Sequence, residues 1–201
     1  MIHTMYFDLG NVLIFFSHEK MYKQLETLSG LSVAQIQSIL LKDQIAYQYE
    51  TGKMNTEELY NHFSALSKKT FSIKEFTQAA SDIFVPNTDL FPFVEQMKKK
   101  QIRLILLSNT SECHFNYIRE AYPIIHLFDE WVLSYKVGAC KPNPLIFQKA
   151  LSLAQCPVSN CFFTDDIPEY VQAARKEGLD SEVFSGVSAF KEHMKDRGLN
   201  F

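Results

Sequence analysis

The sequence predicts an α/β fold in which a doubly wound, mostly parallel sheet carries a small all-helical insertion after its first strand. Short apolar runs alternate with segments of helical length through most of the chain, a pattern typical of strands buried on both faces of a parallel sheet. One long region breaks this alternation and contains only helical patterns. With 201 residues and 46% hydrophobic composition, the chain can bury a sizeable core.

Four apolar runs are the predicted strands, and they span residues 5–7, 102–107, 131–133 and 161–163. Segments with the length and composition of helices lie among the later runs, at residues 89–100, 112–120, 144–154 and 168–177. Because strand and helix alternate, successive strands should run parallel, with helices covering both faces of the sheet.

The region from about residue 16 to residue 84 reads as successive helices without a convincing strand. Two helix starts are marked by capping boxes, in which Asn55 precedes Glu58 and Ser72 precedes Glu75. We therefore predict a core formed by residues 1–15 and 86–201, and a helical insertion formed by residues 16–85.

Composition and charge narrow the classes of function. A formal net charge of -3 provides no cationic field for nucleic acid or anionic lipid, so an anionic ligand must be held by a local site. The four cysteines lack metal-ligand or disulfide-framework spacing. Neither a signal peptide nor an apolar stretch long enough for a membrane span is recognisable. We expect a cytoplasmic protein that binds a small molecule, with no nucleic-acid or membrane partner.

Polar residues follow each predicted strand, at the edge where ligands bind in open parallel sheets. The first run leads into Asp8, the second into Ser108 and Asn109, and the fourth into the pair Asp165 and Asp166, while the loop after the third run carries Lys141. Each has a simpler explanation on its own, since Asp and Ser often cap helices and paired aspartates are usually solvated. Their joint occurrence at strand ends favours a single site.

These residue types match the needs of phosphoryl transfer. Asp8 can attack phosphorus, and Asp165 and Asp166 can help to hold Mg²⁺, which prefers carboxylate oxygens. Lys141 supplies positive charge and helps to keep Asp8 ionised, while Ser108 can donate a hydrogen bond to phosphate.

In chain order, four segments resemble the four motifs of the haloacid dehalogenase-like hydrolase superfamily: Phe7-Asp8-Leu9-Gly10-Asn11-Val12, Leu107-Ser108-Asn109, Lys141-Pro142 and Phe163-Thr164-Asp165-Asp166. The resemblance implies a Rossmann-like core with a cap that closes over the active site. It also implies that Asp8 and Lys141 are catalytic, that Ser108, Asn109 and Lys141 bind the substrate phosphate, and that Mg²⁺ is held by Asp8, the Gly10 carbonyl, Asp165 and Asp166.

The chain departs from the family pattern at two positions. Phosphatases of the superfamily usually have a second Asp two residues after the nucleophile, which protonates the leaving group, whereas this chain has Gly10. Tyr170 stands where the family normally has Asn. General acid–base help is typically worth about 10²- to 10⁴-fold in rate, so the absence of the second Asp requires an explanation.

Three explanations compete. The substrate can have a good leaving group, such as an anomeric sugar phosphate, and the Asp-x-Gly-Asn-Val pattern resembles a branch of short-cap sugar-1-phosphate phosphatases. Alternatively, His18, Tyr47 or Glu50 of the insertion supplies the proton, or the chain binds phosphorylated ligands with little turnover. We favour the first explanation, and with it an Mg²⁺-dependent phosphatase that hydrolyses a small phosphomonoester, such as a sugar phosphate, through an aspartyl-phosphate.

A metal-independent 2-haloacid dehalogenase is the enzymatic alternative. The adjacent carboxylates of Asp165 and Asp166 disfavour it, because without a cation they would repel each other and the nucleophile.

Overall fold

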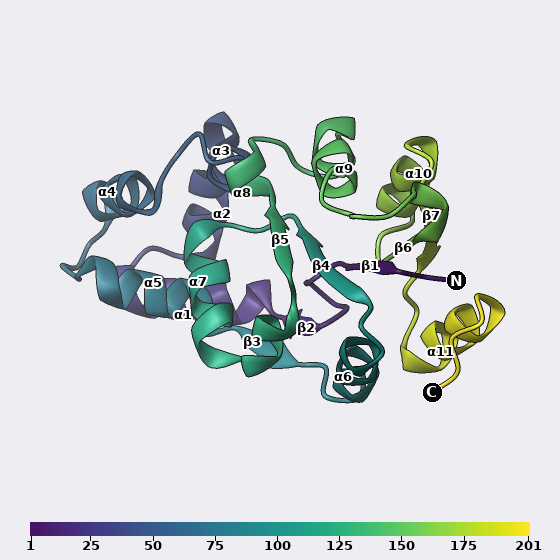
Figure 1. The fold of residues 1–201 in the computed structure, drawn as a ribbon. Helices are drawn as coiled ribbons and strands as arrows, with labels where there is room; N and C mark the ends of the chain where they lie inside the picture. Colours follow the sequence, from purple (N-terminus) through teal and green to yellow (C-terminus); the bar gives the residue numbers. More distant parts are fainter.

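The computed structural model describes residues 1–201, and its centre is a parallel five-stranded sheet with strand order β5-β4-β1-β6-β7 (Figure 1). The strands are β1 (Thr4–Phe7), β4 (Arg103–Ser108), β5 (Glu130–Leu133), β6 (Cys161–Asp165) and β7 (Asp180–Val183). The central strand β1 pairs with β4 on one side and with β6 on the other. The carboxyl ends of these three strands therefore lie side by side, as the predicted α/β fold requires.

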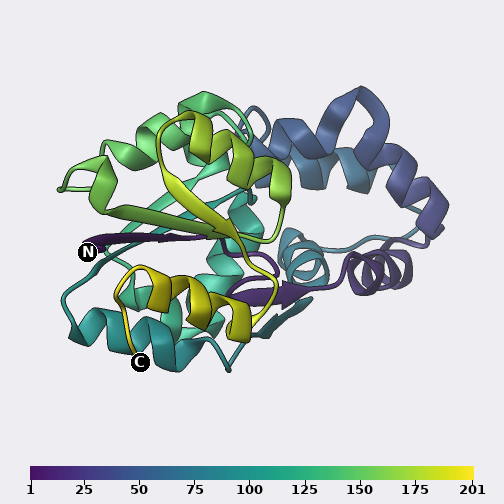
Figure 2. The same cartoon turned by 90° about the vertical axis from the view of Figure 1, so that its right-hand side faces the viewer.

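Helices cover both faces of this sheet (Figure 2). One layer contains α6 (Phe91–Lys99), α7 (Glu112–Ala121) and α11 (Val187–Asp196), and the other contains α9 (Pro144–Leu151) and α10 (Pro168–Lys176). Side chains alternate along β1, so that Met5 and Phe7 pack into the first layer and Tyr6 into the second. Three short helical segments complete the core: η2 (Pro123–Leu127), α8 (Ser134–Val137) and η3 (Val158–Asn160).

The insertion is built from helices with a hydrophobic cluster of their own, which takes one residue, Cys113, from the core. Its elements are α1 (His18–Ser29), α2 (Val33–Leu41), η1 (Lys42–Gln44), α3 (Ile45–Glu50), α4 (Thr56–Leu66) and α5 (Ile73–Ser81). The capping boxes predicted at Asn55 and Ser72 are confirmed, and a third begins α2 at Ser32. No helix of the structure has both the length and the apolar character needed to cross a membrane.

Short strands that the sequence did not predict frame the insertion, and the elements between them are all helices, as predicted. Strand β2 (Ile14–Phe16) pairs antiparallel with β3 (Phe84–Pro86), so the chain enters and leaves the insertion through one two-stranded ribbon. Strands of three residues are too short to produce a recognisable alternation in the sequence. We propose that this ribbon is the boundary between the core and the insertion, which is called the cap below.

The cap docks onto the core through close backbone and side-chain contacts beyond the ribbon. A Cβ atom built on Gly52, whose φ is +69°, would lie 2.0 Å from the carbonyl oxygen of Tyr135. The backbone N–H of Cys113 donates to the Tyr49 hydroxyl at 3.1 Å, and the Thr56 hydroxyl donates to the Glu112 carboxylate at 2.6 Å. Glycine at position 52 therefore permits an approach that any other residue would block.

Candidate active site

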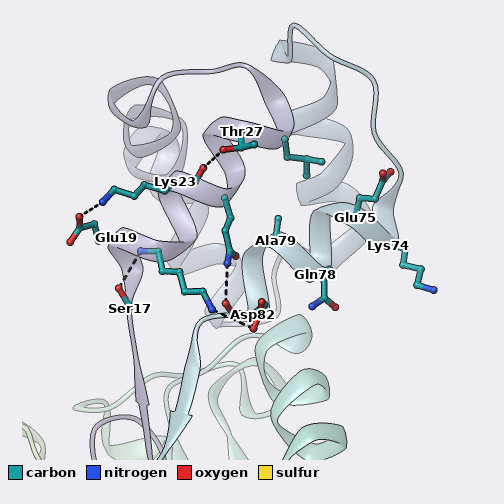
Figure 3. A pocket seen from close by; sticks show the side chains of 12 residues that line it. Ser17, Glu19, Lys23, Thr27, Lys74, Glu75, Gln78, Ala79 and Asp82 are labelled. Carbon is teal, nitrogen blue, oxygen red and sulfur yellow. Dashed lines mark hydrogen bonds and ion pairs between the residues drawn. The ribbon is translucent and has the colours of Figure 1, made fainter.

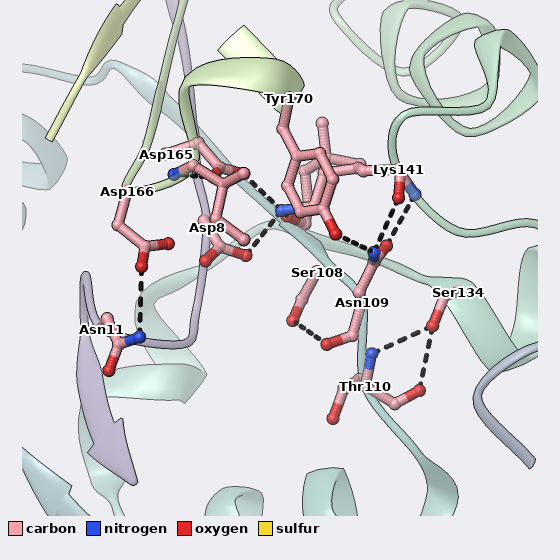
Figure 4. A network of polar contacts seen from close by, with 12 residues as sticks. Asp8, Asn11, Ser108, Asn109, Thr110, Ser134, Lys141, Asp165, Asp166 and Tyr170 are labelled. Carbon is pink, nitrogen blue, oxygen red and sulfur yellow. Dashed lines mark hydrogen bonds and ion pairs between the residues drawn. The ribbon is translucent and has the colours of Figure 1, made fainter. Parts of the chain in front are cut away.

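The predicted catalytic residues meet at the carboxyl edge of the sheet (Figure 4). The ammonium group of Lys141 donates to Asp8 Oδ1 at 2.6 Å, to Asp165 Oδ2 at 2.6 Å and to the backbone carbonyl of Leu107 at 2.9 Å. These contacts join the ends of β1, β4 and β6 to the loop that follows α8. All three donors of the ammonium group are directed at protein oxygens, so its first effect is to organise the neighbouring carboxylates.

Burial controls the charge states of this group. Burial raises the pKa of Asp8 to about 7, although the neighbouring Lys141 ammonium acts in the opposite direction. Burial alone would lower the pKa of Lys141, but the Asp8 and Asp165 carboxylates reverse this effect and raise it above its ordinary value. Lys141 therefore stays charged. Asp8 holds its proton more tightly than a free carboxylate does, until a cation binds beside it.

The loop that carries Lys141 is held by Asn109, which the sequence predicted to bind substrate. The Asn109 side chain accepts from the Lys141 backbone N–H at 2.7 Å and donates to the Lys141 carbonyl at 2.9 Å. Its amide also donates to the Tyr170 hydroxyl at 3.3 Å, and the Tyr170 ring centroid lies 5.3 Å from the Lys141 ammonium nitrogen. Tyr170, which lies in the helix after the fourth motif where the family normally has Asn, is thus part of the same network.

The residues predicted to hold Mg²⁺ are close enough to share a cation. Ligand atoms of Asp8, Asp165 and Asp166 all lie within 4.8 Å of one another. The three carboxylates outnumber the single neighbouring ammonium group, which leaves an excess of negative charge that a divalent cation would balance. The donor set is made of hard oxygen atoms and therefore fits Mg²⁺.

The two adjacent aspartates are placed differently. Both oxygens of Asp165 are engaged, since Oδ2 accepts from Lys141 and Oδ1 accepts from the Ile167 backbone N–H at 2.9 Å. Asp166 is half-buried, and one of its oxygens accepts from the Asn11 side-chain amide at 3.1 Å. Burial raises the pKa of Asp166 as well, so a proton competes with a cation for this carboxylate at low pH. Of the pair, Asp166 is the better placed to ligate a metal directly.

A small cavity of about 120 Å³ lies beside the nucleophile loop and the end of β4. Its lining includes Gly10 and Ser108 from the core, and His18 and Glu50 from the cap. Ser108, which is buried, donates from its hydroxyl to the Asn109 carbonyl at 3.3 Å, a long bond that a phosphate oxygen could replace. Tyr47 does not line this cavity and is 46% exposed, with its ring near Lys53.

An aromatic ring occupies the space where a side chain at position 10 would project. A Cβ atom built on Gly10 would lie 2.9 Å from Cε1 of Phe16. The backbone of Gly10 is not left-handed, whereas the following Asn11 has a φ of 54°. The Gly10 carbonyl accepts no hydrogen bond within the protein, so it is free to ligate a metal. The obstacle to an acidic side chain here is therefore the Phe16 ring rather than the backbone conformation.

The largest hollow of the molecule contains none of the predicted site residues. It is a polar groove of about 1020 Å³ between α1 and α5, crossed by the ion pair of Lys20 with Asp82 at 3.4 Å (Figure 3). The predicted site residues thus lie at the sheet edge and not in the widest opening.

Sequence reasoning missed three residues that shape the site. Asn11 orients Asp166, Phe16 covers Gly10, and Ser134 joins the Thr110 backbone through two hydrogen bonds of 2.9 Å. Asn11 carried a usable signal, because Asn tolerates the left-handed conformation better than most residues. Phe16 and Ser134 carried none, since only the folded chain brings them near the motifs.

Solved structures of known proteins share the fold of this chain. A haloacid dehalogenase-family enzyme from Bacteroides thetaiotaomicron, solved in complex with magnesium and inorganic phosphate, superposes with a TM-score of 0.81 at 24% identity, and the match covers 91% of this chain and 94% of that one. A predicted hydrolase of the same family from Porphyromonas gingivalis gives a TM-score of 0.79 at 23% identity over 96% of this chain and 98% of that one.

A comparison of sequences agrees with these structures. A D-ribitol-5-phosphate phosphatase from Bacteroides thetaiotaomicron is 24% identical over 192 residues, which cover 90% of this chain and 91% of that protein. The family model of haloacid dehalogenase-like hydrolases matches residues 2–178. The chain therefore belongs to the haloacid dehalogenase-like hydrolases and is an enzyme of that family.

Proposed function

We propose that this enzyme is a magnesium-dependent phosphatase that hydrolyses a small phosphomonoester through an aspartyl-phosphate on Asp8. The observation that carries the proposal is the ammonium group of Lys141, which lies 2.6 Å from both Asp8 and Asp165 at the edge where Asp166 also lies. This arrangement suits a carboxylate nucleophile that must meet an anionic phosphoryl group. The phosphatase named among its relatives adds support.

Each residue of the site has a defined task in this mechanism. Asp8 attacks phosphorus, while the charge of Lys141 keeps the attacking carboxylate and the phosphoryl oxygens from repelling each other. Asp165 and Asn109 position Lys141, and Ser108 donates to the phosphate. Asp8, the Gly10 carbonyl and Asp166 would hold Mg²⁺, and Asp165 would support them from behind. The metal, when bound, neutralises the phosphate charge.

The substrate should carry a leaving group that departs without a proton from position 10. Phe16 occupies the space beside Gly10, so no carboxylate there can assist the departing oxygen. Anomeric sugar phosphates, acyl phosphates and aryl phosphates meet this condition, and a sugar phosphate agrees with the sugar-1-phosphate phosphatase resemblance. Glu50 and His18 line the cavity and remain the alternative proton donors.

Release of inorganic phosphate from a panel of phosphomonoesters tests the proposal. Glucose 1-phosphate, acetyl phosphate and phenyl phosphate should be hydrolysed with Mg²⁺ and not with EDTA, and glucose 6-phosphate should react much more slowly. Halide release from 2-haloacids in the presence of EDTA would instead identify a dehalogenase. Failure to release either product would identify a module that binds phosphorylated ligands without turnover.

A further inference from the structure

A second cavity lies inside the cap, next to the small cavity beside Gly10 and Ser108, which is called the catalytic cavity below. It has a volume of about 430 Å³, and 11 of its 16 lining residues are hydrophobic. Met21, Leu25, Leu59 and Phe76 form part of its wall and are themselves buried. Apolar cavities of this size are typical sites for the organic part of a small ligand.

Three residues line both cavities and lie where the two adjoin: His18 of α1, Glu50 at the end of α3 and His114 of α7. The catalytic cavity, at about 120 Å³, is smaller than the roughly 300–1,000 Å³ of typical ligand pockets. A phosphomonoester held at Asp8 therefore has to extend its organic group beyond this cavity. The shared residues lead to the apolar cavity of the cap.

Burial acts on the ionisable groups where the two cavities adjoin. Burial lowers the pKa of His114 to about 4, and its Nε2 lies 3.1 Å from the Ala80 carbonyl, so the ring is neutral. Burial also raises the pKa of Glu50. No Lys or Arg lines the cap cavity, so it offers no fixed positive charge to a second phosphate or a carboxylate of a substrate.

We propose that the cap cavity binds the apolar substituent of an aryl phosphate, and that phosphorylated phenols with an alkyl side chain are the substrate class. This inference rests on the proposed phosphatase function. Two independent features converge on this class. The Phe16 ring fills the space beside Gly10, so the first requirement is a leaving group that departs readily without a proton from position 10, and the mostly hydrophobic lining of the cap cavity sets the second, an apolar group. A phenol meets both requirements, whereas an anomeric sugar meets the first alone.

The reaction balances without any further reactant. A bond forms between an Asp8 oxygen and phosphorus as the bond between phosphorus and the aryl oxygen breaks, and the phenolate leaves with the electron pair and takes a proton from solvent. Water then attacks phosphorus, which frees the Asp8 carboxylate and releases inorganic phosphate.

The test uses phenyl phosphates with para substituents of increasing length: hydrogen, methyl, propyl and pentyl. Alkyl groups of different length change the acidity of the phenol very little, so the series varies apolar surface at a constant leaving group. Each methylene that enters the cavity should raise kcat/KM by about 3- to 4-fold. Glucose 1-phosphate, measured under the same conditions, should be a poorer substrate than the pentyl compound.

Two variants distinguish an effect of filling the cap cavity from the general effects of an Ala→Leu substitution. Ala46→Leu fills the cap cavity from α3, which should abolish the rise of kcat/KM along the series. Ala34→Leu makes the same change on the exposed face of α2, outside both cavities, and should leave the rise intact. Melting temperatures verify that both variants are folded.

The outcomes are distinct. A flat series in an active wild-type enzyme, or glucose 1-phosphate as the better substrate, would overturn the assignment of the cap cavity, even if Ala46→Leu did not fold. An equal rise in Ala46→Leu and Ala34→Leu would also overturn it. Absence of phosphate release from every compound, acetyl phosphate included, would instead refute the proposed phosphatase function.

Discussion

At the carboxyl edge of the sheet, the Lys141 ammonium group bonds to the carboxylates of Asp8 and Asp165, whereas the cavity inside the cap is lined mostly by hydrophobic residues. The first region is fixed by three neighbouring strands that all end at one place. The second depends on how the helices of the cap pack together, and on how they dock onto α7 and α8 of the core.

The difference separates chemistry from recognition. The edge network contains the groups that any phosphoryl transfer needs, and it has no room to distinguish one alcohol from another. The cap cavity offers shape and a mostly apolar surface, and Asp8 and Lys141 do not line it. Changes at the edge should therefore abolish turnover, and changes in the cap should alter which substrate is used.

The largest effect is expected from Asp8→Asn, which removes the attacking oxygen. Turnover should fall to background because the covalent route is lost, while the melting temperature should stay close to that of the wild type. Asp89→Asn makes the same change at an exposed position and should have no effect on either quantity. Phosphate release by the purified Asp8→Asn protein at an appreciable fraction of the wild-type rate would refute the mechanism.

Gly52→Ala should disturb the docking of the cap. The new Cβ would overlap the Tyr135 carbonyl at 2.0 Å, and left-handed backbone strain of roughly 1–3 kcal/mol would add to this clash. Relative to the wild type, we expect hydrogen exchange in Gly52→Ala to become faster in the cap and to change less in the core. We also expect a kcat/KM below that of the wild type. Gly178→Ala is the control, because its φ is +82° but its Cβ would meet no atom within 4 Å. An equal loss of kcat/KM in Gly52→Ala and Gly178→Ala would show that backbone strain, and not the docking of the cap, causes the effect.

Restoring an acid at position 10 should narrow the difference between good and poor leaving groups. Gly10→Asp alone should give little benefit, because the Phe16 ring lies 2.9 Å from the new Cβ. Combined with Phe16→Ala, it should raise kcat/KM for glucose 6-phosphate by about 10²-fold, the lower end of general acid catalysis. Phe16→Ala alone serves as the control. If the folded double variant hydrolysed glucose 6-phosphate no faster than Phe16→Ala, the leaving-group explanation would be wrong.

The smallest effect is the stabilisation of the fold by Mg²⁺. Binding should raise the melting temperature by mass action, and Asp166→Ala should reduce the shift. The shift should be larger at pH 8 than at pH 6, because a ligand must be deprotonated and burial raises the pKa of Asp8 to about 7. A melting temperature that does not respond to millimolar Mg²⁺ at either pH would argue against the metal site.

The sequence predicted the parts of the fold that depend on strong local patterns. Four apolar runs became β1, β4, β5 and β6, because strands buried on both faces need continuous apolar side chains. Strand β7 was missed, since its Asp-Ser-Glu-Val sequence at the edge of the sheet has only one apolar residue. The ribbon of β2 and β3 was missed because each strand has only three residues.

The same contrast holds for the site. Asp8, Lys141 and Asp166 were predictable because parallel strands place their carboxyl ends at one edge. The contact of Phe16 with Gly10 joins two residues across a loop, and the cap cavity joins five helices of the cap with α7. Features of this kind depend on packing between elements, which no short pattern in the sequence records.

Chemical trapping of the covalent enzyme tests the central claim most directly. Wild-type protein would be mixed with Mg²⁺ and radiolabelled acetyl phosphate, quenched in acid within the first turnover, and digested for identification of the labelled peptide. We predict acid-stable label on the peptide that contains Asp8, and none in Asp8→Asn. Turnover without a labelled peptide, or label on a different residue, would contradict an aspartyl-phosphate on Asp8.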